Sequence, residues 1–368
     1  MKSWASLATL LLGAVGLVCG CSQTGTTATP GATDGGVEAA VDAAPPVGSY
    51  TLQFGPIQVA PSEENTQCLV LRLGNVAPIH VGAIHNLLGT SSHHMIVYRV
   101  NDTVEVKTPF NCQPFTDTLN PAAGSALMVS QKKDDLLTFP PGVAYTLDAN
   151  QMIRIEMHYI NPTAATTTLV STTTMIPIAD SAFKYEADFL FIGDPDIRIP
   201  PNSKMTLGPV NFPVPAQFAG VNFFAITGHE HKLGTNVLIS TTSNASMPAA
   251  SSPDLTPVYD VPDWLWSEPA TVSHDPPFQL PAGGGLQFTC EWDNTTQSQV
   301  SFGESANDEM CFFWAYYYPS IGGARVCFHT DMVAGGYNLC CPGDAACDLV
   351  EKYLGVNLDG GVGTGDGG

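Results

Sequence analysis

The sequence predicts an all-β protein made of antiparallel β-sandwiches. Short runs in which apolar and polar residues alternate recur along the chain, and turn residues separate them. The 29 prolines and 35 glycines interrupt any long helical pattern. Because 368 residues are more than one core usually serves, we expect two tandem domains of about 150 residues each. The clearest predicted strands are residues 51–59, 93–100, 152–159, 221–231 and 311–318.

The two ends of the chain differ in composition from its middle. Residues 21–48 are small, polar and rich in Pro and Gly, a composition that cannot bury enough apolar surface to fold, so they predict a disordered tether. The Gly- and Asp-rich residues 351–368 predict a similar tail. A break in the strand pattern near residues 175–183 divides the middle into two predicted domains, residues 49–180 and residues 181–350.

Residues 1–20 have the pattern of an export signal. A single lysine precedes an apolar run from Trp4 to Val18, which is too short to need a membrane-spanning role. The sequence LVCGC resembles the bacterial lipoprotein box, with Cys21 as the lipidated first residue of the mature chain; a plain cleaved signal peptide is the alternative. We therefore expect an exported protein that meets the membrane only through a lipid anchor at the bacterial cell envelope. Ser22 after the cysteine favours the outer membrane.

The charge balance argues against one class of partner. Acidic residues outnumber basic residues 34 to 13, for a net charge of −21, and no stretch gathers Lys or Arg into a patch that could neutralise phosphates. We therefore expect no nucleic-acid partner. The sequence leaves the oligomeric state open.

The cysteines predict disulfide bonds. An even number outside the signal region of an exported chain indicates disulfides rather than zinc ligands, and the chain has no CxxC pair. These eight residues are Cys68, Cys112, Cys290, Cys311, Cys327, Cys340, Cys341 and Cys347.

Five of the nine histidines fall in three tight motifs, which makes them candidate metal ligands. His229 and His231 form an HxH pair, and in a strand such a pair projects both imidazoles from one face. The adjacent His93 and His94 would point to opposite faces of an ideal strand, so they can share a metal only at a twist or a bulge. His158 lies on the face of its strand opposite the apolar residues. For each motif alone, a buried structural histidine is the commoner alternative.

Met310 lies in the polar context SANDEMC rather than in an apolar stripe. Imidazole sites suit zinc, copper or iron, and a thioether ligand would favour Cu(I) and bind zinc poorly. Met310 is thus a candidate copper ligand. A core-filling role is the alternative.

The motifs HHMIVY, IEMHYINP, FAITGHEHKLG and NDEMCFFWAYYYP, in this order, resemble the copper type II ascorbate-dependent monooxygenases. The resemblance covers residues 48–319 and implies two jelly-roll-like β-sandwiches that meet across a solvent cleft, with one copper on each side. It implies that His93, His94 and His158 hold the electron-supplying copper. The catalytic residues that hold the oxygen-binding copper would be His229, His231 and Met310.

The resemblance also implies the chemistry and two disulfide bonds. The enzyme would hydroxylate a C–H bond of a small-molecule substrate with O₂, and two copper ions would be charged by ascorbate or another small reductant. The implied bridges are Cys68–Cys112 and Cys290–Cys311, while the other four cysteines would form two bridges of open connectivity.

Some positions depart from the family pattern. Where the peptide-amidating members of the family bind a substrate carboxylate, this chain has Thr227, Phe312 and Trp314, so a peptide ending in glycine is disfavoured as a substrate. Phe312 and Trp314 share one face of their predicted strand and line either an apolar pocket or the core. Two other functions stay open: a copper-binding envelope lipoprotein without catalysis, and a binding module with degraded sites.

Overall fold

A computed structural model describes residues 48–112, 124–246, 254–261, 264–281, 283–303, 305–331, 336–342 and 347. The predicted signal peptide, Cys21, nearly all of the predicted tether, and the tail lie outside the described residues. Among the described residues, none forms a helix with the length and apolar character that crossing a bilayer requires.

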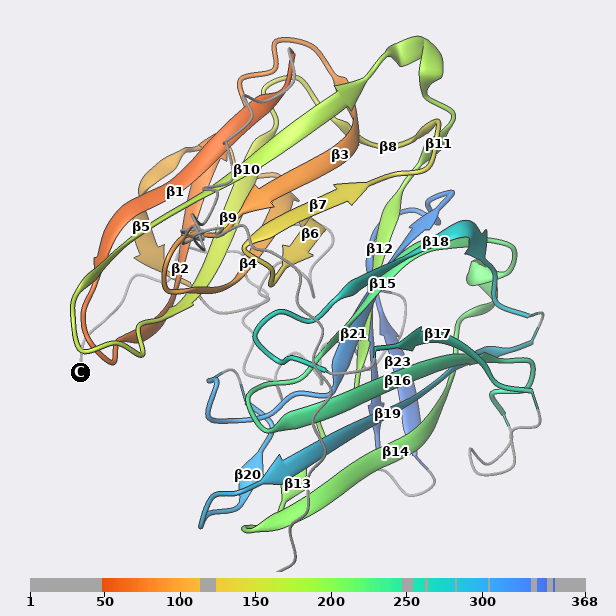
Figure 1. The fold of residues 1–368 in the computed structure, drawn as a ribbon. Helices are drawn as coiled ribbons and strands as arrows, with labels where there is room; N and C mark the ends of the chain where they lie inside the picture. Colours follow the sequence, from red (N-terminus) through yellow and green to blue (C-terminus); the bar gives the residue numbers. More distant parts are fainter. Residues whose placement is uncertain are drawn as a thin grey trace, which may run out of the picture. The chain divides into compact units, whose positions relative to one another are not determined.

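The N-terminal strands form two sheets that enclose one core (Figure 1). The first sheet has the order β1 (Tyr50–Val59), β10 (Thr167–Ile178), β3 (Ile79–Leu87), β8 (Val143–Leu147) and β11 (Tyr185–Glu186), with β7 (Asp134–Thr138) also paired to β3. The second sheet has the order β5 (Val106–Asn111), β2 (Glu64–Arg72), β9 (Met152–Ile160), β4 (Ser92–Val100) and β6 (Gly124–Ser130). We call this unit the N-terminal sandwich.

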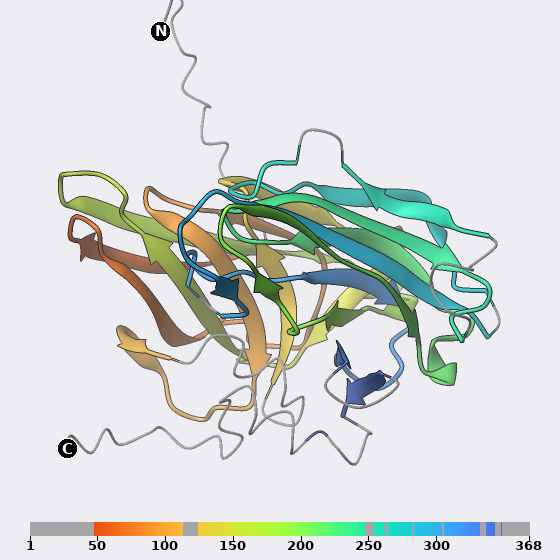
Figure 2. The same ribbon diagram turned by 90° about the horizontal axis from the view of Figure 1, so that it is seen from below.

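The later strands form a second pair of sheets around a core of their own, and Figure 2 shows these green to blue strands from below. One sheet has the order β18 (Thr271–Phe278), β15 (Asn222–His229), β21 (Phe312–Tyr318), β12 (Asp188–Gly193), β22 (Arg325–Thr330) and β23 (Tyr337–Cys341). The other has the order β14 (Ser203–Pro213), β19 (Gly285–Asn294), β16 (Gly234–Thr242) and β17 (Thr256–Asp260). The short strands β13 (Arg198–Ile199) and β20 (Val300–Ser301) pair with each other. We call this unit the C-terminal sandwich.

The all-β prediction is confirmed. In the described part of the chain, two short 3-10 turns interrupt the strands: η1 (Asp180–Ala182) and η2 (Ala216–Phe218). Two strand pairs, β11 with β8 and β12 with β22, are parallel rather than antiparallel. Alternation could not reveal this, because it shows which face a side chain takes and not the direction of the neighbouring strand. Tyr185–Glu186, just past the predicted domain boundary, still pair with the N-terminal sandwich.

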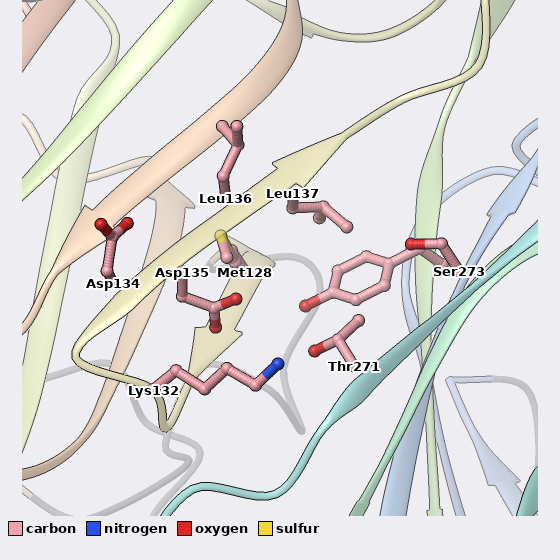
Figure 3. Close-up of a pocket in the computed structure, with 9 residues that line it drawn as sticks. Met128, Lys132, Asp134, Asp135, Leu136, Leu137, Thr271 and Ser273 are labelled. Atoms are coloured by element: carbon pink, nitrogen blue, oxygen red, sulfur yellow. The ribbon is translucent and has the colours of Figure 1, made fainter. Parts of the chain in front are cut away.

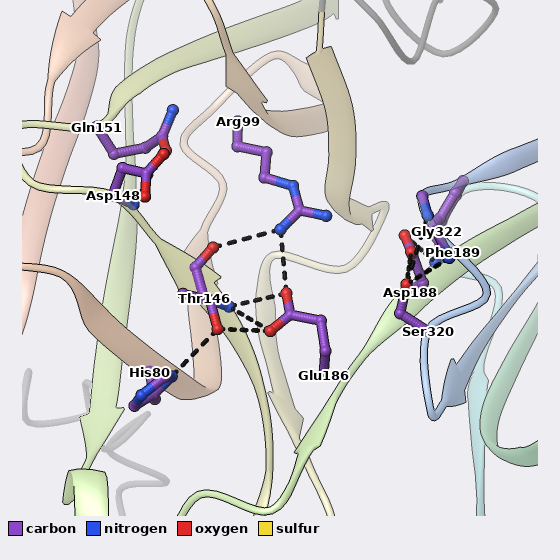
Figure 4. Close-up of polar contacts among 11 residues, drawn as sticks. His80, Arg99, Thr146, Asp148, Gln151, Glu186, Asp188, Phe189, Ser320 and Gly322 are labelled. Carbon is purple, nitrogen blue, oxygen red and sulfur yellow. Dashed lines mark hydrogen bonds and ion pairs between the residues drawn. The ribbon is translucent and has the colours of Figure 1, made fainter.

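Polar contacts anchor the segment that joins the two sandwiches (Figure 4). The Glu186 carboxylate accepts hydrogen bonds from Arg99 Nη1 at 3.1 Å and from the Thr146 backbone N–H at 2.9 Å. On the other side, Ser320 donates its hydroxyl to Asp188. Its backbone N–H donates to the Glu186 carbonyl. The segment from residue 186 to residue 188 is thus hydrogen-bonded to residues of both sandwiches.

The two faces of β21 belong to different cores. Phe313 and Tyr317 lie in the core of the C-terminal sandwich. Phe312, Trp314 and Tyr316 belong instead to the apolar cluster that contains the N-terminal core residues. Phe312 is 3% exposed and Trp314 is 1% exposed. Of the two roles expected for these residues, they therefore have the core role and not that of lining an open pocket.

Candidate metal centre

His93, His94 and His158 come together on two neighbouring strands of the N-terminal sandwich. β4 carries the first two and β9 carries the third, and His94 is the direct partner of His158 in the strand register. The register shifts between Ser92 and His94, which leaves His93 as the extra residue of a bulge. One ligand atom from each of the three histidines lies within 4.8 Å of the others. The bulge thus provides the irregularity that an adjacent pair needs to share a metal.

His229 is the last residue of β15 and His231 lies two residues beyond it, with ring centroids 5.0 Å apart. His229 pairs with Phe312, the first residue of β21. The segment just before β21 reaches His231, because the carbonyl of Asp308 accepts a hydrogen bond from His231 Nδ1 at 3.1 Å. Met310, 2% exposed, belongs to this same segment.

The Glu309 carboxylate binds the HxH turn to this segment. It accepts hydrogen bonds from the backbone N–H groups of His231 at 2.9 Å and Leu233 at 2.7 Å, and from Trp292 Nε1 at 2.9 Å. Burial raises the pKa of Glu309 to about 7. Three donors on one buried carboxylate hold the backbone beside Met310 in a single place.

Four of the five candidate histidine ligands favour the neutral form that a metal ligand needs. Burial lowers the pKa values of His93, His94 and His229 well below the usual range, and it lowers the pKa of His231 to about 4. A neutral imidazole keeps one nitrogen lone pair for a metal.

Hydrogen bonds select which ring nitrogen stays available. His229 Nδ1 donates to Gln131 Oε1 at 3.0 Å and His231 Nδ1 donates to Asp308, while the buried Nε2 atoms of both rings have no protein partner. His158 Nε2 instead contacts Glu64 Oε1 at 3.1 Å, which leaves Nδ1 as its ligand atom. Metal-binding histidines typically have their second nitrogen held in this way. Buried imidazole nitrogens without protein partners, together with a buried methionine on the adjoining segment, fit copper.

The two ligand sets lie close together. The expectation that a solvent cleft separates them is therefore wrong for this structure. The ring centroids of His93 and His231 are 6.1 Å apart, and those of His94 and His229 are 6.2 Å apart. None of the five rings is more than 7% exposed. The reason is packing across the two sandwiches, in which the aromatic face of β21 joins the N-terminal cluster.

A polar cavity of about 230 Å³ is lined by residues of both sandwiches (Figure 3). Lys132, Asp135 and Thr271 point into it. Tyr316 also lines it. Burial raises the pKa of the Asp135 carboxyl. Lys132, which lines the cavity, directly follows Gln131, whose side chain accepts the hydrogen bond from His229 Nδ1. On the other side, Thr271 is hydrogen-bonded at 2.8 Å to Thr227, two residues before His229.

All four disulfide bonds of the eight cysteines are present. Cys68–Cys112 and Cys290–Cys311 match the pairings that the resemblance implied. The remaining bridges, whose connectivity the sequence left open, are Cys327–Cys340 and Cys341–Cys347. Cys311 directly follows Met310, so its bridge to β19 anchors the segment that carries the methionine.

Sequence reasoning missed Glu64, Gln131 and Trp266. Glu64 and Gln131 each hold a ring nitrogen of a candidate ligand, and the Trp266 ring lies 5.3 Å from that of His93. No motif marks these residues, because each reaches its histidine through long-range folding. The four other histidines have structural contacts, with Phe183, Asp134, the Val258 carbonyl and Asn338.

Comparisons with known proteins add information mainly on the C-terminal sandwich. No curated protein matches the chain. A crystal structure of a putative secreted protein from Parabacteroides distasonis ATCC 8503 is 8% identical, with 74% of this chain and 81% of that chain covered and a TM-score of 0.16. A structure of the infectious bursal disease virus Gt strain is 10% identical, with coverages of 74% and 73% and a TM-score of 0.15.

The family comparison concerns the part of the chain that carries His229, His231 and Met310. This part, about two fifths of the chain, contains the C-terminal sandwich up to β22. Residues 185–333 match the model of the copper type II ascorbate-dependent monooxygenase, C-terminal domain, which supports this family for the chain.

Proposed function

We propose that this protein is a copper-dependent monooxygenase that hydroxylates a C–H bond of a small organic substrate with O₂ and an external reductant such as ascorbate. The observation that carries the proposal is the pair of buried ligand sets, His93, His94 and His158 beside His229 and His231, with Met310 on the adjoining segment. The family match over residues 185–333 supports the same reaction type.

Copper supplies one-electron redox chemistry. Insertion of one oxygen atom of O₂ into a C–H bond, with reduction of the other to water, takes two electrons from the external reductant, so two copper ions per chain suit the reaction. The protein's own part is to hold and shield the ligands.

The side chains around the ligands have defined tasks in this proposal. Gln131 and the Asp308 carbonyl hold the rings of His229 and His231 so that both Nε2 atoms are available. Glu309 and the Cys290–Cys311 bridge hold the backbone on either side of Met310. Burial keeps the imidazoles neutral over the physiological pH range.

The substrate would be a small molecule that reaches His229 from the polar cavity. Thr227 provides no cation near His229, whereas Lys132 of the N-terminal sandwich provides one in the cavity. A cavity of about 230 Å³ accommodates a small molecule and excludes a folded partner. We also infer that Cys21 anchors the exported protein to the cell envelope through lipid, in agreement with the LVCGC motif.

A copper-binding envelope protein without turnover is the second candidate, because the same ligands would serve it. The two functions differ in redox cycling. The chain from residue 45 onward forms a compact unit and is suitable for the test. We expect it to bind two copper ions that ascorbate reduces and O₂ reoxidises, and a substrate screen would follow. Copper that never reoxidises would favour the binding protein, and a chain that binds no copper would overturn both functions.

A further inference from the structure

Glu64 contacts both halves of the metal centre. It is the first residue of β2, and its side chain is 25% exposed. Its Oε1 atom accepts hydrogen bonds from His158 Nε2 at 3.1 Å and from the Ala306 backbone N–H at 2.9 Å. Its Oε2 atom accepts a hydrogen bond from the Ser305 hydroxyl at 3.2 Å. One carboxylate therefore joins a ligand of the N-terminal set to a segment of the C-terminal sandwich.

The segment that Glu64 binds is the one that supports the second ligand set. The Asp308 N–H donates to the Ser305 carbonyl at 2.8 Å, and the Asp308 carbonyl accepts the hydrogen bond from His231. Met310 follows two residues later. A continuous chain of contacts thus runs from His158 through Glu64, Ser305 and Asp308 to His231.

We propose that Glu64 is a positioning residue for both metal sites at once. It fixes His158 as the Nε2–H tautomer, so that Nδ1 faces the metal. It also holds residues 305–310 where Met310 and His231 complete the second site. The metal-binding part of this inference rests on the proposed copper function.

The neighbouring Glu63 supplies a matched control. Its carboxylate accepts hydrogen bonds from the Ala60 backbone N–H at 2.7 Å and from Tyr159 Oη at 3.5 Å, both within the N-terminal sandwich. Glu63→Gln therefore repeats the chemical change of Glu64→Gln one residue away, without the link to Ser305 and Ala306. Glu64→Asp keeps the charge but shortens the reach.

The decisive experiment removes the local effect on His158. In a His158→Ala background, copper bound at His229, His231 and Met310 is titrated against a chromophoric Cu(I) chelator, with and without Glu64→Gln. We expect Glu64→Gln to weaken this copper by about 10- to 100-fold, the usual effect of losing a group that orients metal ligands. Glu63→Gln should change nothing, and Glu64→Asp should lie between. An unchanged affinity with Glu64→Gln would overturn the proposal.

Two measurements on the copper-free protein separate this inference from the proposed function. Nitrogen NMR should show His158 as the Nε2–H tautomer in the parent chain and a mixture in Glu64→Gln. Hydrogen exchange at the Ala306 amide should accelerate at least tenfold in Glu64→Gln and stay unchanged in Glu63→Gln. If both changes occur in a chain that binds no copper, the positioning role stands and the copper function fails. If neither occurs, the positioning role fails whatever the chain binds.

Discussion

The two ligand sets of this molecule are built in different ways. The N-terminal set lies on two paired strands of one sheet, where the register of β4 with β9 brings His94 opposite His158. The C-terminal set takes one histidine from the end of β15 and one from the turn that follows, and its methionine belongs to a segment between strands. That segment needs support from Glu309, from a disulfide bond and from the N-terminal sandwich.

This difference teaches where each site is vulnerable. Strand pairing involves many hydrogen bonds, so the loss of one side chain outside the N-terminal set leaves the backbone of its two strands in place. A site that includes an irregular segment depends on a few specific contacts, and each of these contacts contributes measurably. We therefore expect variants outside the ligands to affect the C-terminal set more than the N-terminal set.

The largest effects should come from the ligands themselves. His158→Ala and His229→Ala should each remove one of the two proposed copper ions and abolish ascorbate-driven O₂ uptake, because each ligand set loses an imidazole. Elemental analysis of dialysed protein measures the copper. His85→Ala is the control, since its ring pairs with Asp134 at the surface. Full copper binding in either ligand variant would show that the sets are misassigned.

The next largest effect should follow from Glu309→Ala. The change leaves three buried donors, on His231, Leu233 and Trp292, without their acceptor. At about 1–3 kcal/mol for each unsatisfied group, we expect the free energy of unfolding to fall by about 3 kcal/mol or more. Urea unfolding measures this loss, and Glu291→Ala on the exposed face of β19 is the control. A loss below about 1 kcal/mol would mean that the segment holds its place without Glu309.

The free energy of unfolding should depend on pH through Asp194, which is hydrogen-bonded to the residue after Met310. The Asp194 N–H donates to the Cys311 carbonyl, and burial raises the pKa of the Asp194 carboxyl to about 6. Since the unfolded carboxyl titrates near about 3.9, the folded state binds the extra proton between these values. The contribution of Asp194 to stability is therefore present at low pH and lost as the pH rises through about 6.

Asp194→Asn should remove this dependence. Relative to the parent chain, we expect the variant to gain about 2–3 kcal/mol in unfolding free energy between about pH 4 and pH 7. Urea unfolding at several pH values provides the comparison, with the exposed Asp254→Asn as the control. A constant difference between variant and parent would contradict the raised pKa.

The smallest effect that we predict concerns Gln131. Its amide oxygen holds His229 Nδ1, so Gln131→Leu should weaken copper at the C-terminal set by about tenfold and leave the N-terminal set unchanged. Chelator competition measures the C-terminal copper in the His158→Ala background and the N-terminal copper in the His229→Ala background. Ser125→Ala, which changes a buried polar residue of β6, should have no effect. Equal weakening of both sets would show that the two sites cannot be separated in this way.

Several features could be predicted from the sequence because they depend on local order. Alternation with a period of two revealed the strands and placed His158 on the face opposite its apolar neighbours. The adjacent His93 and His94 required a bulge, and the structure has one between Ser92 and His94. The resemblance implied both Cys68–Cys112 and Cys290–Cys311, and these bridges are present.

The tertiary structure alone decided what covers these residues. His158 is on the polar face of its strand and is still only 4% exposed, because residues distant in the sequence pack over it. The same packing brings His93 close to His231 and places Phe312 and Trp314 in a core. Glu64 finds its partners 94 and 241 residues away. The physical reason is that alternation reports which face of a strand a side chain takes, whereas contacts between sheets depend on the pairing of the whole chain.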